Sequence, residues 1–382
     1  MKANIPKVLI VDLSKDYGGA SARALTLMQN YPQGRIILAA LENSPVAQYA
    51  LEKNLSTIVV GKKKYDVRIF FSLTKAIRVY GIDIVDVQNI QSKFWGSLSA
   101  FFSKVTLVST LNSWYFSEHQ RTNIKGMIYT AIELLTNWSM PHYIVVSQKI
   151  FDALCRVRVN PNCISLVYNA VDVNMTQAIE DTNDIRTKLN VPLDASICVA
   201  LGRLVWAKGY EDLIQAFTLL KGKKHNLFCA IIGGGELQSS LSKKIVRDNL
   251  TDRIFLLGHF DHKNALSAIK TCDIFVMPSR TEGTPIALLE AAALGIPILA
   301  TNIGGIPELV TEQDALLVPA NSPEALAAGL LKLAKDNKLA QLLSKNAYCR
   351  VNELFSVRKL LSATLDAYHK ALSCDRTYGS VS

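Results

Sequence analysis

The sequence predicts an α/β protein of two Rossmann-like domains, each with a parallel sheet covered by helices on both faces. Short apolar runs rich in β-branched residues alternate with segments of helical spacing along most of the 382 residues, as in parallel strands joined by helices. A polar stretch without aromatic residues, 176–188, separates two such series and is expected to link the domains. A chain of this length, 49% hydrophobic, can bury two separate cores.

Each series contains enough strands for its own sheet. The first series is expected to form strands at 8–13, 36–40, 58–60, 84–87, 105–111, 144–147 and 164–168, and the second at 197–201, 227–232, 254–257, 274–277, 298–300 and 316–318. We therefore expect a first domain at 1–176 and a second at 177–361, with 362–382 as a candidate to complete the first. Open parallel sheets bind ligands at the carboxyl ends of their strands, so the two sheets are expected to face a central ligand cleft.

The cysteines and the apolar segments indicate the cellular compartment in which the protein is expected. The seven cysteines include no C-x-x-C pair, and several lie in apolar runs, which is typical of reduced core residues. The apolar run at 8–11 is too short for a signal peptide, and that at 286–300 is interrupted by Glu290, Gly295 and Pro297. We expect a cytoplasmic protein that does not cross a membrane, with the inner face of the plasma membrane as a peripheral site.

Basic residues are in excess, mainly in the first half of the chain. Residues 1–180 contain 19 basic and 12 acidic residues, a net charge of +7, within an overall charge of +10. Such a surface attracts anionic partners, for example phospholipid or a pyrophosphate-linked acceptor. A solvated surface with excess lysine explains the charge equally well, and nucleic acid is not an expected partner.

The most informative stretch runs from Ser279 to Gly295, directly after the expected strand 274–277. Thr284 is a good N-cap, Pro285 suits the first helical position, and Gly295 suits the left-handed position beyond the end. The helix is therefore expected at 285–294.

The start of this helix predicts an anion site between two carboxylates. The amides of Ile286 and Ala287 lie at the positive end of the helix dipole and suit a diphosphate. Glu290 lies about 7.5 Å further along the helix axis, which suits a ribose diol, and Glu282 lies before the helix, which suits a hexose hydroxyl. Taken alone, the stretch is better explained by two structural residues, one glutamate at a helix start and one on the surface.

At this point the sequence resembles the retaining glycosyltransferases of family GT4. The resemblance rests on the spacing Glu282-x7-Glu290, on the run 304–308 and on the motif 202–209; it implies the GT-B fold and a nucleotide-sugar donor. In that family Arg203 and Lys208 would bind the donor diphosphate and stabilise the departing nucleotide without a metal ion or other cofactor. The implied catalytic residues are Glu282, Arg203 and Lys208. The implied donor-binding residues are Gly18, Gly19, Arg203, Lys208, Phe260, Glu282, Gly283, Thr284, Pro285, Ile286 and Glu290.

The chain departs from the family pattern after the expected strand 105–111. Many members have a histidine there, whereas this sequence has Asn112, which forms hydrogen bonds but does not titrate. Asn112, Trp114 and His119 are candidate contacts to the sugar or the acceptor. His119 and His142 are candidate replacements for the histidine, although a lone histidine is more often a surface or packing residue. A dehydrogenase is excluded because Gln238 stands where the dinucleotide fingerprint needs its last glycine.

Basic and aromatic residues gather in two stretches of the first half, 61–71 and 94–102. Together they suit a membrane interface, although helical spacing assigns Phe101 and Phe102 to the core.

These features predict a hexosyltransferase that uses a UDP- or GDP-sugar to extend a glycan, with a lipid-linked surface glycan, as in polysaccharide or lipopolysaccharide biosynthesis, as the expected acceptor. Three alternatives share the fold: a nucleotide-sugar epimerase, a glycogen-type synthase and a non-catalytic nucleotide-sugar-binding subunit.

Overall fold

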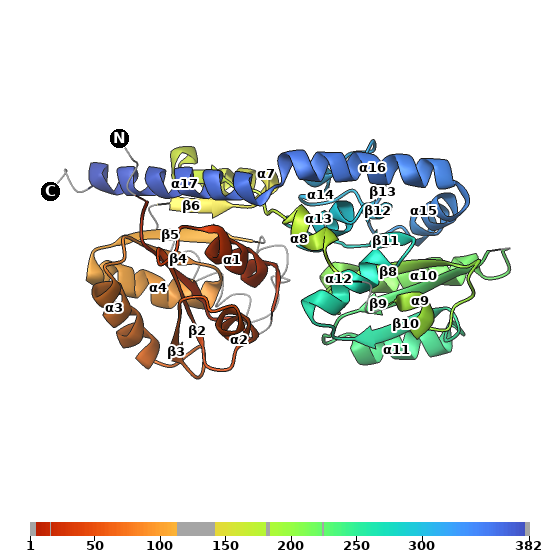
Figure 1. Cartoon of the computed structure of the whole chain (residues 1–382), viewed down its shortest axis with the longest axis horizontal. Helices are drawn as coiled ribbons and strands as arrows, with labels where there is room; N and C mark the ends of the chain where they lie inside the picture. The colour runs from red at the N-terminus through yellow and green to blue at the C-terminus, as the bar shows by residue number, and fades with distance from the viewer. Residues whose placement is uncertain (1–4, 16, 113–141, 181–183, 224, 379–382) are drawn as a thin grey trace. The chain divides into compact units, whose positions relative to one another are not determined.

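The computed structural model describes residues 5–15, 17–112, 142–180, 184–223 and 225–378. The chain forms two compact units. Unit 1 comprises 1–169 and 357–382, and unit 2 comprises 170–356. Each unit has a parallel sheet with helices packed on it (Figure 1).

The sheet of unit 1 has seven strands in the order β3-β2-β1-β4-β5-β6-β7, all paired in parallel. The strands are β1 (Val8–Asp12), β2 (Ile36–Leu41), β3 (Thr57–Gly61), β4 (Ile84–Val87), β5 (Thr106–Leu111), β6 (His142–Val145) and β7 (Ile164–Leu166). All seven coincide with or overlap the predicted apolar runs. The central strands are buried along their whole length, which explains why they appear as continuous apolar runs and not as alternating ones.

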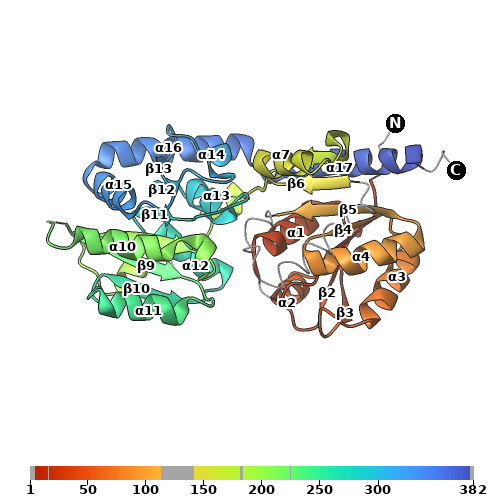
Figure 2. The same ribbon diagram turned by 180° about the vertical axis from the view of Figure 1, so that it is seen from behind.

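Helices cover both faces of this sheet. The described helices are α1 (Gly19–Asn30), α2 (Pro45–Glu52), α3 (Arg68–Tyr80), α4 (Ile90–Ser103), α7 (Gln148–Arg156) and α17 (Val357–Tyr378). Helices α3 and α4 pack against each other and on strands β3, β4 and β5, and Figure 2 shows them side by side. The side chains of Asn89 and Ser147 cap α4 and α7 by accepting hydrogen bonds from Ser92 N and Ile150 N.

The last helix of the chain belongs to unit 1, far from its neighbours in sequence. Helix α17 packs on α1, β5 and β6, and Figure 1 shows it alongside these strands. Its Tyr368 hydroxyl donates a 2.7 Å hydrogen bond to Asp86 Oδ2 on β4. Thr110 Oγ1 and Gln88 Nε2 donate to the other oxygen of that carboxylate at 2.8 and 3.0 Å. Both partners of the long-range bond are buried, so a polar contact anchors the terminal helix.

The sheet of unit 2 has six parallel strands in the order β10-β9-β8-β11-β12-β13. They are β8 (Ser196–Leu201), β9 (Leu227–Ile232), β10 (Ile254–Gly258), β11 (Ile274–Met277), β12 (Ile298–Thr301) and β13 (Leu316–Val318). The described helices of this unit are α8 (Val173–Gln177), α9 (Ile185–Lys188), α10 (Tyr210–Leu220), α11 (Gln238–Arg247), α12 (His262–Lys270), α13 (Ile286–Ala293), α14 (Ile306–Leu309), α15 (Pro323–Lys335) and α16 (Asn337–Leu354). The prediction of two parallel α/β sheets is confirmed.

The connection between the units lies earlier than the sequence suggested. The chain divides at Asn169 and Ala170 and again at Ser356 and Val357, whereas the expected boundaries were 176/177 and 361/362. The described part of 176–188, expected as the linker, belongs to unit 2. There Ile185 N donates to Thr271 Oγ1 at 3.2 Å, and the Ile185 side chain is fully buried. Composition alone missed this because few of these residues are apolar.

None of the described helices is long and apolar enough to span a bilayer.

Candidate active site

Four loops meet at the carboxyl ends of strands β8, β9, β11 and β12 in unit 2, and backbone hydrogen bonds join them. Arg280 N donates to Ala207 O at 2.8 Å, Leu204 N to Gly234 O at 2.9 Å, and Gly305 N to Glu282 O at 3.3 Å. Parallel strands all end at one edge of their sheet. The fold thereby brings the motif 202–209 next to the loop 278–285, and both segments follow strands.

Two glycines allow these loops to touch. Gly209 has φ +65°, and a Cβ there would lie 2.0 Å from Pro278 O. Gly304 has φ +60°, and a Cβ there would lie 2.1 Å from Glu282 O. Any side chain at either position would push the loops apart, since both the backbone angle and the space require glycine.

Lys208 and Glu282 form the closest ion pair of this edge. Lys208 Nζ lies 2.5 Å from Glu282 Oε1, and Ser279 Oγ donates to the same oxygen at 2.7 Å. The side chains of Lys208 and Glu282 are 21% and 9% exposed. Oε2 of Glu282 has no hydrogen-bond partner among the described residues, so the carboxylate is held in place through one oxygen and offers the other.

Helix α13 follows this loop and carries Glu290 on its buried side. The helix begins at Ile286, with Pro285 as the N-cap, and ends at Ala293, one residue shorter at each end than predicted. Gly295 has the expected left-handed conformation, with φ +69°. Thr284 and Pro285 are buried, while Gly283 and Ile286 are half-buried. The helix therefore begins four residues after Glu282, the partner of Lys208.

Glu290 is paired with a histidine from another element. His262 Nε2, at the start of α12, lies 2.6 Å from Glu290 Oε1. The Glu290 side chain is 8% exposed and that of His262 is 38% exposed. Burial lowers the pKa of His262, but the hydrogen bond and the charge of Glu290 outweigh it and raise that pKa above its ordinary value. The pair therefore favours a charged imidazolium on a carboxylate.

The two arginines of these loops differ in their surroundings. Arg203 is exposed and forms no ion pair with the described residues. Arg280 instead bridges to α10, with its NH1 2.8 Å from Glu211 Oε2 and its NH2 2.7 Å from Asp212 Oδ1. Arg280 thus fixes the loop, while Arg203 keeps its charge available to an anion.

Phe260 follows strand β10 and is half-buried. Lys188 Nζ, from α9, lies 4.4 Å from the centre of its ring. This cation–π contact holds the Phe260 side chain against unit 2.

In unit 1 the predicted residues follow strands β1 and β5. Gly18 precedes α1, with φ −152°, and Gly19 is the first residue of that helix. A Cβ at Gly18 would meet no described atom within 4 Å, so packing within the described chain does not require glycine there. Asn112 Nδ2 donates to Gln88 Oε1 at 3.3 Å, and Asn112 Oδ1 has no partner among the described residues.

The remaining candidates named with Asn112 are Trp114, His119 and His142. Trp114 and His119 lie outside the described residues. His142 is fully buried in β6, with Nε2 2.8 Å from Ser165 Oγ. Burial lowers its pKa to about 4. His142 is therefore a packing residue, and its suggested role as a replacement for the family histidine is wrong.

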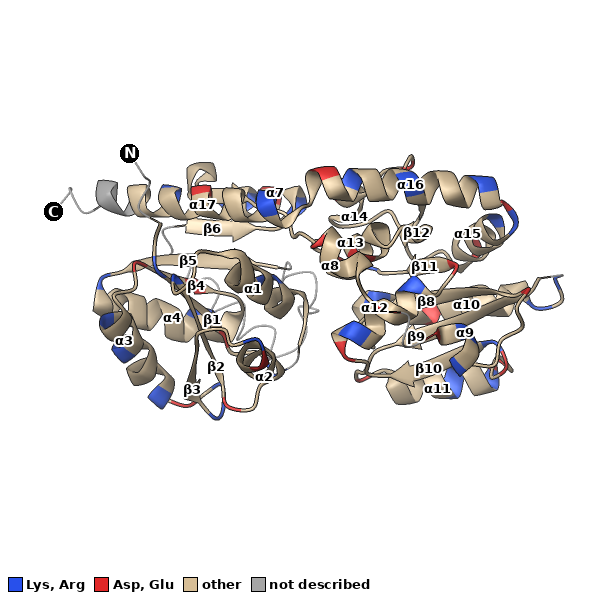
Figure 3. Cartoon of the chain, in the orientation of Figure 1, with Lys and Arg blue, Asp and Glu red and all other residues tan. Residues whose placement is uncertain are grey.

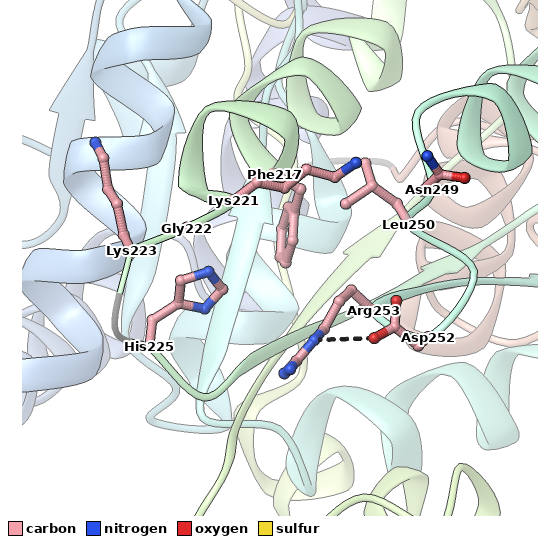
Figure 4. A pocket seen from close by; sticks show the side chains of 9 residues that line it. All are labelled: Phe217, Lys221, Gly222, Lys223, His225, Asn249, Leu250, Asp252 and Arg253. Carbon is pink, nitrogen blue, oxygen red and sulfur yellow. Dashed lines mark ion pairs between the residues drawn. The ribbon is translucent and has the colours of Figure 1, made fainter.

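A surface pocket elsewhere in unit 2 has no such chemistry. It lies between the end of α10 and the starts of β9 and β10, and is lined by Phe217, Lys221, Gly222, Lys223, His225, Asn249, Leu250, Asp252 and Arg253 (Figure 4). This is the amino-terminal edge of the strands, opposite to where open parallel sheets bind their ligands.

Two residues of the site were missed by sequence reasoning. His262 is one histidine at a helix start, and its partner lies 28 residues away, so no local pattern reveals the pair. Ser279 stands three residues before Glu282, and this spacing could have suggested the hydrogen bond. No group of three or more His, Cys, Asp or Glu side chains suited to a metal ion occurs among the residues with described side chains.

Known proteins share both the sequence pattern and the fold. The family described as Glycosyl transferases group 1 matches residues 181–350, and Glycosyltransferase Family 4 matches residues 17–175. The chain is 26% identical, over 96% of its length and 97% of the relative's, to the UDP-Gal:alpha-D-GlcNAc-diphosphoundecaprenol alpha-1,3-galactosyltransferase of Escherichia coli. It is 25% identical, over 73% and 74%, to the N,N'-diacetylbacillosaminyl-diphospho-undecaprenol alpha-1,3-N-acetylgalactosaminyltransferase of Campylobacter jejuni.

Among solved structures, HepE of Anabaena in complex with UDP-glucose superposes with a TM-score of 0.84 at 18% identity, over 95% of this chain and 99% of that one. The two matched families together span most of the chain, and the Escherichia coli relative is similar over nearly its whole length. The protein therefore belongs to glycosyltransferase family 4 and is a nucleotide-sugar glycosyltransferase with the GT-B fold.

Proposed function

We propose that the protein transfers a hexose from a UDP-sugar to a hydroxyl of a lipid-linked glycan, with retention of the anomeric configuration. The observation that carries this proposal is the Lys208–Glu282 pair at the start of α13. It brings together a cation for a diphosphate, a carboxylate for a sugar hydroxyl and a helix start that favours anions. UDP is preferred to GDP because the Escherichia coli relative is named for UDP-Gal and the HepE structure contains UDP-glucose.

In this proposal each described side chain has a separate task. Arg203 and Lys208 neutralise the diphosphate as it leaves, while the first turn of α13 donates to its oxygens. Glu290 accepts from the ribose hydroxyls, and Glu282 accepts from a hydroxyl of the hexose through its free Oε2. In unit 2 the loop at Phe260 is a further proposed contact to the donor. In unit 1 the proposed donor contacts are Gly18 and Gly19, and the proposed sugar contact is Oδ1 of Asn112.

The proposed reaction is a front-side substitution, as the family resemblance implies. The acceptor oxygen forms a bond to C1 of the hexose as the bond from C1 to the diphosphate oxygen breaks. The acceptor proton passes to a phosphate oxygen of the departing UDP. No side chain near Asn112 needs to titrate in this scheme, so the loss of the family histidine is compatible with transfer.

The lipid-linked acceptor is the finer part of the proposal. The relatives from Escherichia coli and Campylobacter jejuni are both named for acceptors on diphosphoundecaprenol. The excess of basic residues in 1–180 suits an acceptor that carries a diphosphate.

Ligand binding and transfer can be tested separately. Thermal unfolding with UDP, GDP and ADP should show the largest rise in Tm with UDP, because a ligand of the folded state stabilises it by mass action. Incubation with radiolabelled UDP-hexoses and extracted lipid-linked glycans should then label the lipid fraction, and the new linkage should keep the anomeric configuration of the donor.

Arg203→Ala provides the control for transfer. We expect it to reduce labelling by about 100-fold or more, as for loss of one charge-stabilising group. A wild-type rate equal to that of Arg203→Ala with every donor that binds would favour the non-catalytic subunit. Interconversion of the donor without an acceptor would favour an epimerase.

A further inference from the structure

Helices α3 and α4 of unit 1 expose a string of aromatic rings. Phe71, Phe101 and Phe102 are 68%, 74% and 59% exposed. The half-buried Phe70 connects them. The centre of its ring lies 5.2 Å from the ring centre of Phe71 and 5.6 Å from that of Phe102, and the ring centres of Phe101 and Phe102 are 5.6 Å apart. The rings therefore form one continuous apolar strip across the seam between the helices, which we call the aromatic strip (Phe70, Phe71, Phe101 and Phe102).

This finding corrects the expectation that Phe101 and Phe102 are core residues. Helix α4 packs on the sheet through small side chains, including Gly96, Ser99 and Ala100. A Cβ at Gly96 would lie 2.3 Å from Val87 Cγ1, so the helix lies too close to the strand for a large residue there. Phe94 and Leu98 are also exposed, and their spacing places them on the stripe of α4 that includes Phe101 and Phe102.

Helix α3 and the segments next to α3 and α4 carry exposed cations, and the two helices have no acidic residue. Neither α3 nor α4 contains an Asp or Glu, and residues 62–80 contain six basic residues and one acidic residue, Asp66. Figure 3 shows α3 with blue bands and no red. Lys63, Lys75, Arg78 and Lys104 are exposed and form no ion pair with the described residues. Their charges remain available to an anionic partner.

We infer that the aromatic strip and these exposed cations dock the protein on an anionic lipid bilayer. Exposed phenylalanines beside lysines and arginines are typical of surfaces that lie in the headgroup region, with the rings at the acyl boundary and the cations at the lipid phosphates. A patch of this kind is larger than isolated apolar residues on an ordinary surface.

The same composition argues against other occupants. Lysine is depleted at protein–protein interfaces, whereas exposed lysines occur on α3 and in the segments next to α3 and α4. A second copy of the chain would bring two cationic surfaces together, which electrostatic repulsion disfavours. The exposed cations and rings instead complement a surface that offers both phosphate and hydrocarbon.

This docking extends the proposed function, because an enzyme bound at a bilayer meets a lipid-linked acceptor there. The test needs neither donor nor acceptor, so its failure would leave the transfer experiment untouched. Full-length protein is sedimented with vesicles of phosphatidylcholine alone or mixed with phosphatidylglycerol. We expect binding to the mixed vesicles, weakened as the Debye length falls from about 10 Å at 0.1 M salt to about 3 Å at 1 M.

Variants separate ring insertion from charge attraction. The triple variant Phe71→Ser, Phe101→Ser, Phe102→Ser should bind the mixed vesicles at least about tenfold more weakly. Lys75→Gln with Arg78→Gln should lower the sensitivity to salt. The matched control, Val246→Ser with Leu342→Ser, changes two equally exposed apolar residues of unit 2, 60% and 56% exposed, and should bind as the wild type does.

Three results would overturn the inference. The first is absence of wild-type binding to mixed vesicles at low salt. The second is equal vesicle affinity of the wild type and the triple variant when their thermal unfolding is the same. The third is a wild-type dimer that becomes monomeric in the triple variant, by light scattering, without any vesicle binding; the aromatic strip would then be a contact between protein copies.

Discussion

Glu282 and Glu290 lie before and within the same short helix, yet each has a partner of its own. Glu282 pairs with Lys208, and Glu290 pairs with His262. Loss of Glu282 would release Lys208 to a phosphate, whereas loss of Glu290 would remove an acceptor for ribose. The two carboxylates should therefore have different effects on the binding of nucleotide.

We predict that Glu290→Ala weakens binding of UDP alone by about 10- to 100-fold, the cost of a hydrogen bond to a charged group. Glu282→Ala should change UDP binding by less than about threefold but impair turnover of the intact donor. Calorimetric titration with UDP, together with transfer rates, measures both effects. Glu312→Ala, an exposed carboxylate of unit 2, is the control. Equal losses of UDP affinity in the two site variants would contradict the assignment.

His262 provides a second prediction at this scale. Because its pKa is raised in the folded protein, its stabilising contribution is complete below the ordinary value of about 6.5 and is lost as pH rises through the raised pKa. His262→Gln should remove this part of the pH dependence of the free energy of unfolding. The part removed should be less than about 1 kcal/mol, because the pair is partly exposed. It should also weaken UDP binding several-fold, since Glu290 loses its support.

The control for His262 is its neighbour His259, which is exposed. Denaturant unfolding of wild type, His262→Gln and His259→Gln across pH 6 to 8 compares them. If the wild-type dependence on pH persists in His262→Gln, the His262–Glu290 pair does not act as a charged pair in solution.

At the scale of elements, the strands were predictable and some helix surfaces were not. A parallel strand buried on both faces is a run of apolar residues, and this signal is local. Helix α4 shows the opposite case, because small residues such as Gly96, Ser99 and Ala100 lie on its packing face, whereas Phe101 and Phe102 are exposed. A hydrophobic pattern alone assigns the larger residues to the core, which is why Phe101 and Phe102 were misassigned.

The contacts that complete each site depend on long-range pairing and were only partly predictable. The motif with Glu282 and Glu290 was recognisable because helix signals and spacing occur within one stretch. The partners Lys208 and His262 come from other segments, a loop after β8 and the start of α12, and only the order of strands in the sheet makes them neighbours. The contact between Tyr368 and Asp86 spans 282 residues, beyond any local pattern.

That contact predicts how helix α17 responds to pH. Burial raises the pKa of Asp86 to about 6, although the hydrogen bonds from Tyr368 and Thr110 and the charge of Arg23 act in the opposite direction. The folded state therefore favours the protonated carboxyl. The contribution of Asp86 to the free energy of unfolding is complete below about pH 4 and is lost as pH rises through about 6. Asp86→Asn should remove this dependence, which amounts to at most about 1.4 kcal/mol per pH unit.

Denaturant unfolding from pH 4 to 7 compares the wild type with Asp86→Asn and with the control Asp366→Asn, which changes an exposed carboxylate on α17. Tyr368→Phe should cost about 1 to 3 kcal/mol at neutral pH, because the buried carboxylate loses a donor. A wild-type pH dependence that persists in Asp86→Asn would exclude the Asp86 carboxyl as its source.

At the scale of the whole molecule, the chain combines a general excess of positive charge with two specific cations at the candidate site. Arg203 is exposed without an ion-pair partner among the described residues, and Lys208 lies at the start of α13 beside Glu282. A cation held by the protein can stabilise a departing diphosphate in the way that a divalent metal does. If Arg203 and Lys208 stabilise the departing diphosphate, the reaction needs no divalent metal ion from solution.

We predict that transfer survives removal of divalent metals. With a chelator in excess, the rate of hexose transfer should remain within about twofold of the untreated rate, whereas Lys208→Ala should lower it by about 100-fold or more, as expected when a charge-stabilising group is lost. The assay should use an acceptor dissolved in detergent, because divalent ions also alter the binding of cationic surfaces to anionic lipids. Lys243→Ala, a cation in the middle of α11, is the matched control and should transfer at the wild-type rate. Complete loss of wild-type transfer in chelator, restored by magnesium or manganese, would show that Arg203 and Lys208 do not suffice to stabilise the departing UDP.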